Sequence, residues 1–168
     1  PEEGNPACQL FGKDPSVMGE AAAKVTALGR FTSLDINMGC PARKVVSSGE
    51  GSALLLDPER AYRVMEAVKR NTDLPVTVKT RLGYDADSMN ALELGRAAQQ
   101  LGFRWIAIHG RTRQQQYAGT ADWAAIGALK ARLTLPVIAN GDIFTAAIPG
   151  CSGRRAGPWR AARPKRYP

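Results

Sequence analysis

The sequence has few of the residues that build metal centres or disulfide frameworks. Its 168 residues include one histidine, His109, and three widely spaced cysteines, Cys8, Cys40 and Cys151. Zinc sites need clustered cysteines and histidines, and disulfide scaffolds need cysteines that can pair. The sequence therefore predicts no metal site and a reducing compartment, the cytoplasm.

Long hydrophobic runs are missing as well. No apolar stretch approaches the roughly 20 residues that a membrane-spanning helix requires, and the chain does not open on a signal peptide. Hydrophobic residues make up 44% of the chain and charged residues 23%, a balance typical of globular domains. The sequence therefore predicts a globular protein with no membrane partner.

Acidic residues are absent from one end, where the positive charge gathers. The net charge is +8, but residues 151–168 contain six basic and no acidic side chains, which leaves the first 150 residues near +2. Charge alone therefore does not predict an RNA-binding body. We interpret 147–168 as a disordered basic tail, because it lacks periodicity and is rich in proline and arginine. Translation of a shifted reading frame is an alternative hypothesis that the nucleotide sequence would settle.

Short apolar runs alternate with helical patterns along residues 1–146. The runs are nearly continuous, as in strands covered on both faces, and are Ala7–Phe11, Ser33–Ile36, Pro75–Val78, Trp105–Ile108 and Pro136–Ala139. Helix signals follow the first four runs: Asp14 with Pro15, Asp57 with Pro58, a start at Ser88, and a start after Thr120. Repeated βα units predict an α/β protein with a parallel sheet. The segment 39–56 is the widest connection, and we expect a functional loop there.

Polar side chains follow each predicted strand. They are Gln9, Asn37, Cys40, Lys79, Arg81, His109, Arg111, Asn140 and Asp142. Because the carboxyl ends of parallel strands share one edge, we expect these residues to form one site. Four of them have an ordinary structural alternative: Cys40 as an inert buried thiol, Lys79 as a lysine with a buried stem and a solvated ammonium, His109 as a structural histidine, and Asn140 within a simple turn.

Cys40 lies directly before Pro41, which favours an extended or turn conformation at the cysteine. A thiol held just beyond a strand can donate a proton as a general acid or, when deprotonated, attack as a nucleophile. The residues alone leave both roles open.

In combination, these residues resemble the tRNA-dihydrouridine synthases, most closely their bacterial B-type branch. The resemblance runs from about residue 9 to 144. It rests on Gln9–Gly12, Asp35–Pro41, Gly51–Leu55, Val76–Arg81, His109–Thr112, Tyr117, Gly119 and Val137–Asp142.

The resemblance implies an FMN-dependent oxidoreductase on a (β/α)8 TIM barrel, which reduces uridine in tRNA to 5,6-dihydrouridine with NADPH as reductant. Cys40 would be the catalytic general acid that protonates uracil C5. The implied cofactor-binding residues are Gln9, Lys79, His109, Asn140, Gly141 and Asp142. The implied substrate-binding residues are Asn37, Arg81 and Arg111.

The resemblance also implies that the chain is incomplete. Residues 1–146 would form a partial FMN-binding barrel whose five βα units correspond to strands three to seven. We therefore expect weak FMN binding, or none, by this chain alone, and the sequence predicts no oligomeric state. Two alternative functions remain: another FMN-dependent pyrimidine oxidoreductase, and a non-catalytic RNA-binding remnant that depends on the basic tail.

Overall fold

The structure is a computed structural model that describes residues 6–143 of the chain. Five parallel strands form one sheet in the order of the sequence. They are β1 (Ala7–Leu10), β2 (Ser33–Met38), β3 (Val76–Arg81), β4 (Trp105–His109) and β5 (Val137–Asn140). The predicted tail 147–168 lies outside the described residues. No helix within 6–143 has the length and apolarity needed to cross a membrane.

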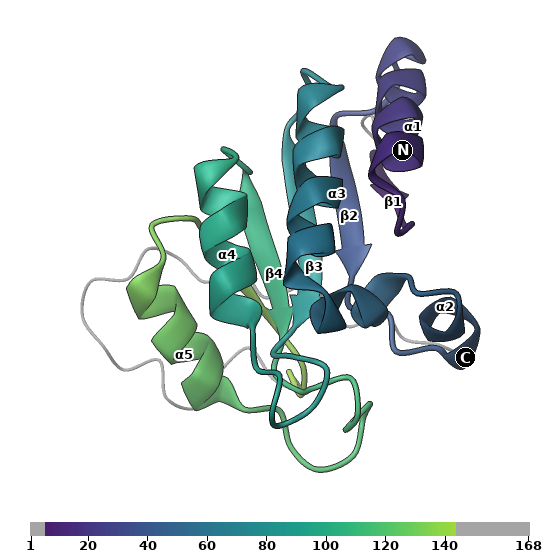
Figure 1. Ribbon diagram of the computed structural model, residues 1–168. Coiled ribbons are helices and arrows are strands. Elements are labelled where there is room, and N and C mark those ends of the chain that lie inside the picture. Colours follow the sequence, from purple (N-terminus) through teal and green to yellow (C-terminus); the bar gives the residue numbers. More distant parts are fainter. Residues whose placement is uncertain (1–5, 144–168) are drawn as a thin grey trace, which may run out of the picture.

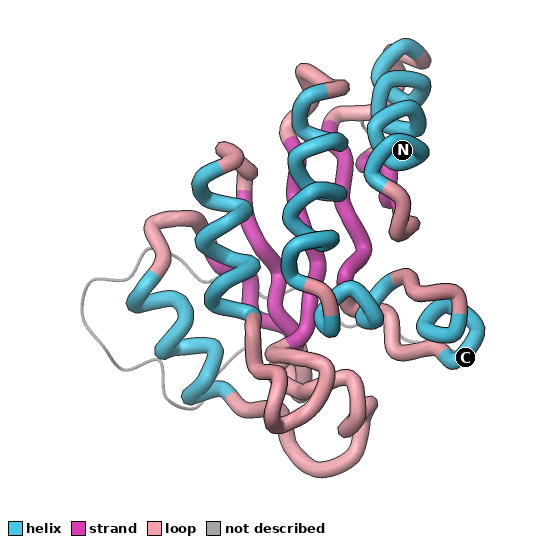
Figure 2. Tube along the Cα trace, in the orientation of Figure 1, coloured by secondary structure: helices cyan, strands magenta, loops and turns pink. Residues whose placement is uncertain are grey.

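The larger helices all cover the same face of the sheet (Figures 1 and 2). They are α1 (Pro15–Ala27), α3 (Pro58–Arg70), α4 (Ala91–Gln100) and α5 (Trp123–Arg132). A doubly wound sheet reverses its strand order and carries helices on both faces. Here the order never reverses and the described helices stay on one side, which is the arrangement of a (β/α)8 barrel. The predicted fold, five units of such a barrel, is confirmed.

Aspartate side chains start three of the helices. The carboxylates of Asp14, Asp57 and Asp122 accept hydrogen bonds from backbone N–H groups at 3.0, 3.0 and 2.8 Å. The first two caps were predicted from the Asp-Pro pairs. The predicted start at Ser88 is wrong, because α4 begins at Ala91. The Ser88 hydroxyl donates instead to Asp85 at 2.6 Å, closing a turn before the helix.

The connection between β2 and α3 is more ordered than predicted. It contains the short helix α2 (Arg43–Ser47) and the 3-10 helix η1 (Gly51–Leu56). Leu54 and Leu55 of η1 are 1% exposed and extend the hydrophobic core. The burial of two leucines in succession stabilises this segment against the sheet. The connection is therefore largely helical and not an open loop, while its functional role stays a prediction.

The strands have one apolar and one polar face, whereas the sequence suggested apolar cover on both. Leu34, Ile36, Val76 and Val78 are fully buried in the core shared with the helices. The alternate positions of the strands project to the opposite side, which we call the inner face. Strands β2 to β5 also run past their predicted ends, so that Asn37, the Lys79–Arg81 stretch, His109 and Asn140 belong to the strands themselves.

Candidate active site at the carboxyl ends of the strands

Strand register brings most of the predicted site residues into neighbouring rows on the inner face. Asn37 pairs with Lys79 across β2 and β3. Arg81 pairs with His109 across β3 and β4, and His109 pairs with Asn140 across β4 and β5. Gln9 lies one row further back, opposite Asp35. The predicted residues therefore do meet at one end of the sheet.

A chain of hydrogen bonds links three strands in these rows. Asp35 accepts from Thr77 Oγ1 and from Gln9 Nε2, both at 2.6 Å. Gln9 Oε1 in turn accepts from Asn37 Nδ2 at 3.1 Å. Asp35 and Thr77 were not predicted as site residues, although Asp35 precedes Asn37 by two positions and so shares its face. The chain fixes which way the Asn37 amide points.

The side-chain oxygen of Asn37 faces residues 39–41, which we call the cysteine turn. Its Oδ1 accepts from the backbone N–H groups of Gly39 and Cys40 at 3.2 and 3.0 Å. A Cβ at position 39 would lie 3.1 Å from the carbonyl carbon of Thr80, so glycine permits this close approach of the turn to β3. Asparagine side chains commonly close such turns. The hydrogen-bond chain therefore ends at the residue predicted to carry the chemistry.

The other side of Cys40 rests on η1. Its carbonyl accepts from the backbone N–H of Ser52 at 3.1 Å and from Ser52 Oγ at 2.8 Å. Gly51 has φ +59°, and a Cβ there would lie 3.1 Å from Cys40 Cβ. Cys40 is a free, partly buried thiol. The backbone of Cys40 is thus held from two sides, and its sulfur forms no disulfide within residues 6–143.

Lys79 projects from the middle of the inner face. Its ammonium makes no hydrogen bond or ion pair with any residue in the described part of the chain. Burial, followed by the positive charge of Arg81, lowers its pKa to about 8, while Asp35 acts in the opposite direction. A cation that is costly to hold without a partner is suited to bind an anionic or electron-rich group.

His109 is surrounded by positive charge and is held between two polar partners. Its Nδ1 lies 3.0 Å from Asn140 Oδ1, and its Nε2 lies 3.4 Å from Arg111 Nη1. Burial and the charges of Arg81 and Lys79 lower its pKa to about 4, against the hydrogen bond to Asn140. The imidazole is therefore neutral at pH 7, with Nδ1 donating to Asn140 and Nε2 accepting from Arg111.

Arg111 is 5% exposed, and its guanidinium N–H groups bind Asp142 and the loop after β4, residues 110–122. It forms a two-bond ion pair with Asp142, at 2.9 and 2.8 Å, and this hydrogen bonding is the main cause that lowers the pKa of Asp142. It also donates to the carbonyls of Ala118 and Gly119 at 3.0 and 2.7 Å. Arg111 thus anchors Asp142 and the loop after β4. The sequence did not predict this role.

Arg81 has a similar anchoring position and is 2% exposed. Its Nε donates to the carbonyl of Gly39 at 3.0 Å, and its Nη1 donates to the carbonyls of Thr112 and Gln116 at 3.0 and 2.8 Å. Its Nη2 has no hydrogen-bond partner among residues 6–143. Arg81 therefore ties the cysteine turn to the loop after β4.

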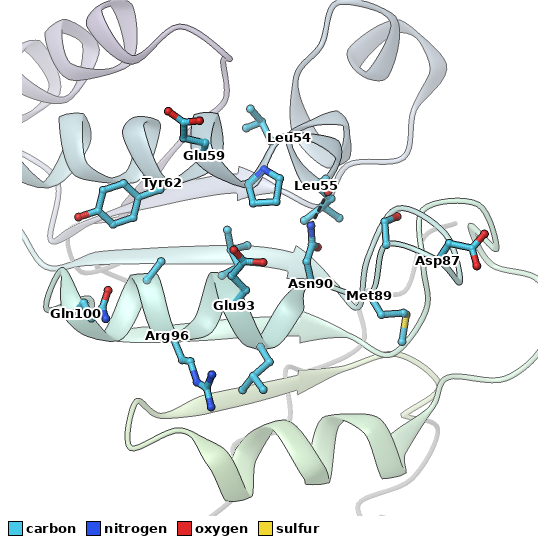
Figure 3. Close-up of a pocket in the computed structure, with 15 residues that line it drawn as sticks. Leu54, Leu55, Glu59, Tyr62, Asp87, Met89, Asn90, Glu93, Arg96 and Gln100 are labelled. Atoms are coloured by element: carbon cyan, nitrogen blue, oxygen red, sulfur yellow. Dashed lines mark hydrogen bonds between the residues drawn. The ribbon is translucent and has the colours of Figure 1, made fainter.

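A separate cavity of about 780 Å³ lies on the helical side of the sheet (Figure 3). Residues of η1, α3, α4 and the loop before α4 line it, and Asn90 Nδ2 donates across it to the Leu55 carbonyl at 2.5 Å. It contains none of the predicted site residues. The chemistry-bearing groups gather at the strand ends instead, so we take the inner face as the candidate site.

The described part of the chain holds no group of three metal-ligating side chains. The inner face offers a thiol, an ammonium, a neutral imidazole and amide groups at the carboxyl ends of parallel strands. In (β/α)8 barrels this is the end that carries active sites. The fold and the candidate site together indicate a segment of a (β/α)8 barrel of the kind that carries enzyme active sites.

A sequence profile described as "Dihydrouridine synthase (Dus)" matches residues 1–148. The chain belongs to the dihydrouridine synthase family, as predicted. It is 50% identical over 148 residues to a "Probable tRNA-dihydrouridine synthase" of Rhodobacter capsulatus, across 88% of this chain and 44% of that protein. It is 47% identical over 135 residues to "tRNA-dihydrouridine synthase B" of Xanthomonas campestris, across 80% of this chain and 40% of that protein.

The chain thus spans less than half the length of these relatives. Among solved structures, it resembles a D-glucarate dehydratase from Agrobacterium tumefaciens complexed with magnesium, with a TM-score of 0.55 and 17% sequence identity. That match covers 80% of this chain and 33% of the other. At this identity the likeness concerns the fold alone, and it supports the assignment of a partial barrel.

Proposed function

We propose that this chain is the core of the catalytic site of a tRNA-dihydrouridine synthase, a cytoplasmic enzyme that reduces uridine in tRNA to 5,6-dihydrouridine. The observation that carries the proposal is the meeting of Cys40, Lys79 and His109 at one end of a barrel sheet, in a chain of this family. We take tRNA as the substrate from the names of the relatives, which are called tRNA-dihydrouridine synthases. We propose FMN as the cofactor and NADPH as its reductant.

The residues of the inner face fit FMN. The Lys79 ammonium has no partner within residues 6–143, so it is free to bind an electron-rich edge of the flavin ring. On the inner face Gln9 lies one row behind Lys79 and His109 one row ahead of it. Hydrogen bonds fix the orientation of both polar side chains. Gly141 has φ +122°, and a Cβ there would lie 2.8 Å from Ala121 Cβ, so the backbone of Asn140–Asp142 passes close to β4 and its loop. We propose that this backbone segment and Asp142 hold the polar side chain of the cofactor.

Reduction of the uracil C5–C6 bond needs a hydride at C6 and a proton at C5. FMN, if bound here and reduced, would supply the hydride. We propose that Cys40 supplies the proton from Sγ, leaving a thiolate that takes up a proton from solvent after release of the product. The backbone of Cys40 is held by Asn37 and Ser52, which limits the positions available to the sulfur.

A uridine must leave its stack to reach this position. We propose that Arg81 orients the extruded base through Nη2, the nitrogen of its guanidinium that is not engaged by the loops. Asn37 lies beside Cys40 and is proposed to contact the same base. Both terminal nitrogens of Arg111 are occupied by Asp142 and Gly119, and its contact with the uridine stays a prediction.

The variant Cys40→Ala, made in the complete gene product, tests the acid role. We expect NADPH to reduce the flavin at the normal rate, because Cys40 takes no part in that step. We expect dihydrouridine formation to fall by about 10²- to 10⁴-fold, the usual contribution of a general acid. Flavin absorbance in stopped flow gives the first rate, and mass spectrometry of digested tRNA gives the second.

Cys8→Ala is the matched control, because Cys8 is a free cysteine on β1 whose side chain packs against the core, away from the inner face. It should keep both rates. Dihydrouridine formation at full rate by Cys40→Ala would show that the proton comes from another group.

A further inference from the structure

Tyr117 is a large aromatic side chain that the proposed mechanism does not use. It is 72% exposed, the highest value among the exposed large hydrophobic residues of the described segment. Its ring nevertheless lies beside the site. The Arg81 guanidinium carbon is 5.6 Å from the ring centroid, and the His109 ring meets it edge-on with centroids 6.2 Å apart.

The backbone on both sides of Tyr117 is held in place. Gln116 has φ +51°, the single non-glycine residue of 6–143 in the left-handed region. Its carbonyl accepts from Arg81 at 2.8 Å, and the Ala118 carbonyl that follows the tyrosine accepts from Arg111 at 3.0 Å. Unfavourable backbone conformations persist where the surrounding structure enforces them, and they gather at functional sites.

An exposed ring on an anchored backbone is preorganised to receive a flat partner. The guanidinium of Arg81 lies over one face of the ring, so the opposite face is the one available for stacking. A cation on one side of an aromatic ring is itself a favourable contact that helps to keep the ring in place. Exposed aromatic rings at the edge of a nucleic-acid site commonly stack on unpaired bases.

We propose that Tyr117 stacks on a nucleobase of the RNA substrate that borders the extruded uridine. Removing a uridine from its stack leaves the neighbouring base without a partner. The tyrosine ring lies outward from Arg81 and His109, which we place at the uridine and the cofactor, and it replaces the lost stacking partner. This inference rests on the proposed function and adds the residue that accepts the RNA around the target base.

The test compares Tyr117→Ala and Tyr117→Phe in the complete gene product. Alanine removes the ring and should raise both the Kd and the KM for tRNA by roughly 5- to 150-fold, the range that follows from one base-stacking contact. Phenylalanine keeps the ring and should stay close to the unmodified protein. Reduction of the flavin by NADPH should be unchanged in both variants, since no RNA takes part in it.

Phe31→Ala is the matched control. Phe31 also carries a guanidinium over its ring, that of Arg30 at 5.4 Å, but it lies before β2 at the opposite end of the sheet. Its loss should leave the affinity for tRNA unchanged.

Two results would overturn the inference. In the first, Tyr117→Ala binds tRNA normally and slows flavin reduction, which would place the ring on the cofactor. In the second, Tyr117→Phe is as weak a binder as Tyr117→Ala, which would make the hydroxyl group responsible. If the unmodified protein binds tRNA and forms no dihydrouridine, the proposed function fails, and the Kd of Tyr117→Ala for tRNA still decides the stacking.

Discussion

The variant Arg81→Lys keeps a positive charge on the inner face but removes the donors that join three segments of the chain. In the present structure the guanidinium binds the carbonyls of Gly39, Thr112 and Gln116. A lysine ammonium is a compact charge on a flexible stem and cannot reproduce the geometry of the arginine fork. We expect the cysteine turn and the loop after β4 to lose their connection to each other.

The size of the effect follows from the bonds that are lost. Hydrogen bonds to a charged group contribute about 1.5–3 kcal/mol each. Lysine can restore one of the three, and relaxation of the loops lets water reach the released carbonyls. We therefore expect the free energy of unfolding to fall by about 2–4 kcal/mol. Dihydrouridine formation should fall as well, because Cys40 and Tyr117 both depend on segments that Arg81 holds.

The measurement is urea unfolding of the complete gene product, followed by circular dichroism, together with the kcat for tRNA reduction. Arg113→Lys is the matched control in the same loop. The Arg113 guanidinium lies over the Tyr84 ring at 5.1 Å, and its buried Nε has no hydrogen-bond partner within 6–143. If Arg81→Lys unfolds at the same urea concentration as the unmodified protein and keeps its kcat, Arg81 does not hold the site together.

Two further predictions concern Lys79 and Gly51. The pKa of Lys79 is lowered to about 8 in the folded state, so the unfolded state binds its proton more tightly. The free energy of unfolding should then rise between pH 8 and 10, by up to about 1.4 kcal/mol per pH unit from this residue, and Lys79→Met should lack that rise in urea unfolding. Gly51→Ala should destabilise the protein by about 1–3 kcal/mol through its positive φ, and should also reduce dihydrouridine formation, because the new Cβ would crowd Cys40 Cβ. Gly102→Ala is the control for strain alone, since Gly102 has φ +70° and no atom within 4 Å of an added Cβ; equal activity in the two variants would exclude the crowding of Cys40.

The parts of this fold that sequence predicts well depend on neighbours along the chain. The helix starts at Pro15 and Pro58 follow from an aspartate cap and a proline in the first turn. Polar residues near the carboxyl ends of five strands predict one site, because parallel strands share an edge. These signals need no knowledge of distant contacts. The structure confirms the helix starts and places these polar residues at one edge of the sheet; that they form a functional site stays a prediction.

The parts that sequence missed depend on contacts between distant segments. The carbonyls that Arg81 binds belong to residues 31 to 42 positions away, and nothing in the string around Arg81 indicates them. The same holds for Thr77, whose bond to Asp35 spans 42 positions. The 3-10 helix η1 was missed because its stability comes from burying Leu54 and Leu55 in the core, and burial cannot be read from six residues.

The charges of the inner face are unequally compensated. Asp142 pairs directly with Arg111 through two bonds, whereas Asp35 is engaged by the neutral donors of Gln9 and Thr77. Positive potential therefore concentrates at Lys79 and Arg81. Burial first, and then these two charges, lower the pKa of His109 to about 4. In such a site the imidazole stays neutral, and the charged form of the lysine is stabilised when an electron-rich group binds beside it. That imbalance is the physical reason for our proposal that the inner face binds a flavin and a pyrimidine, since both rings present carbonyl oxygens along their edges.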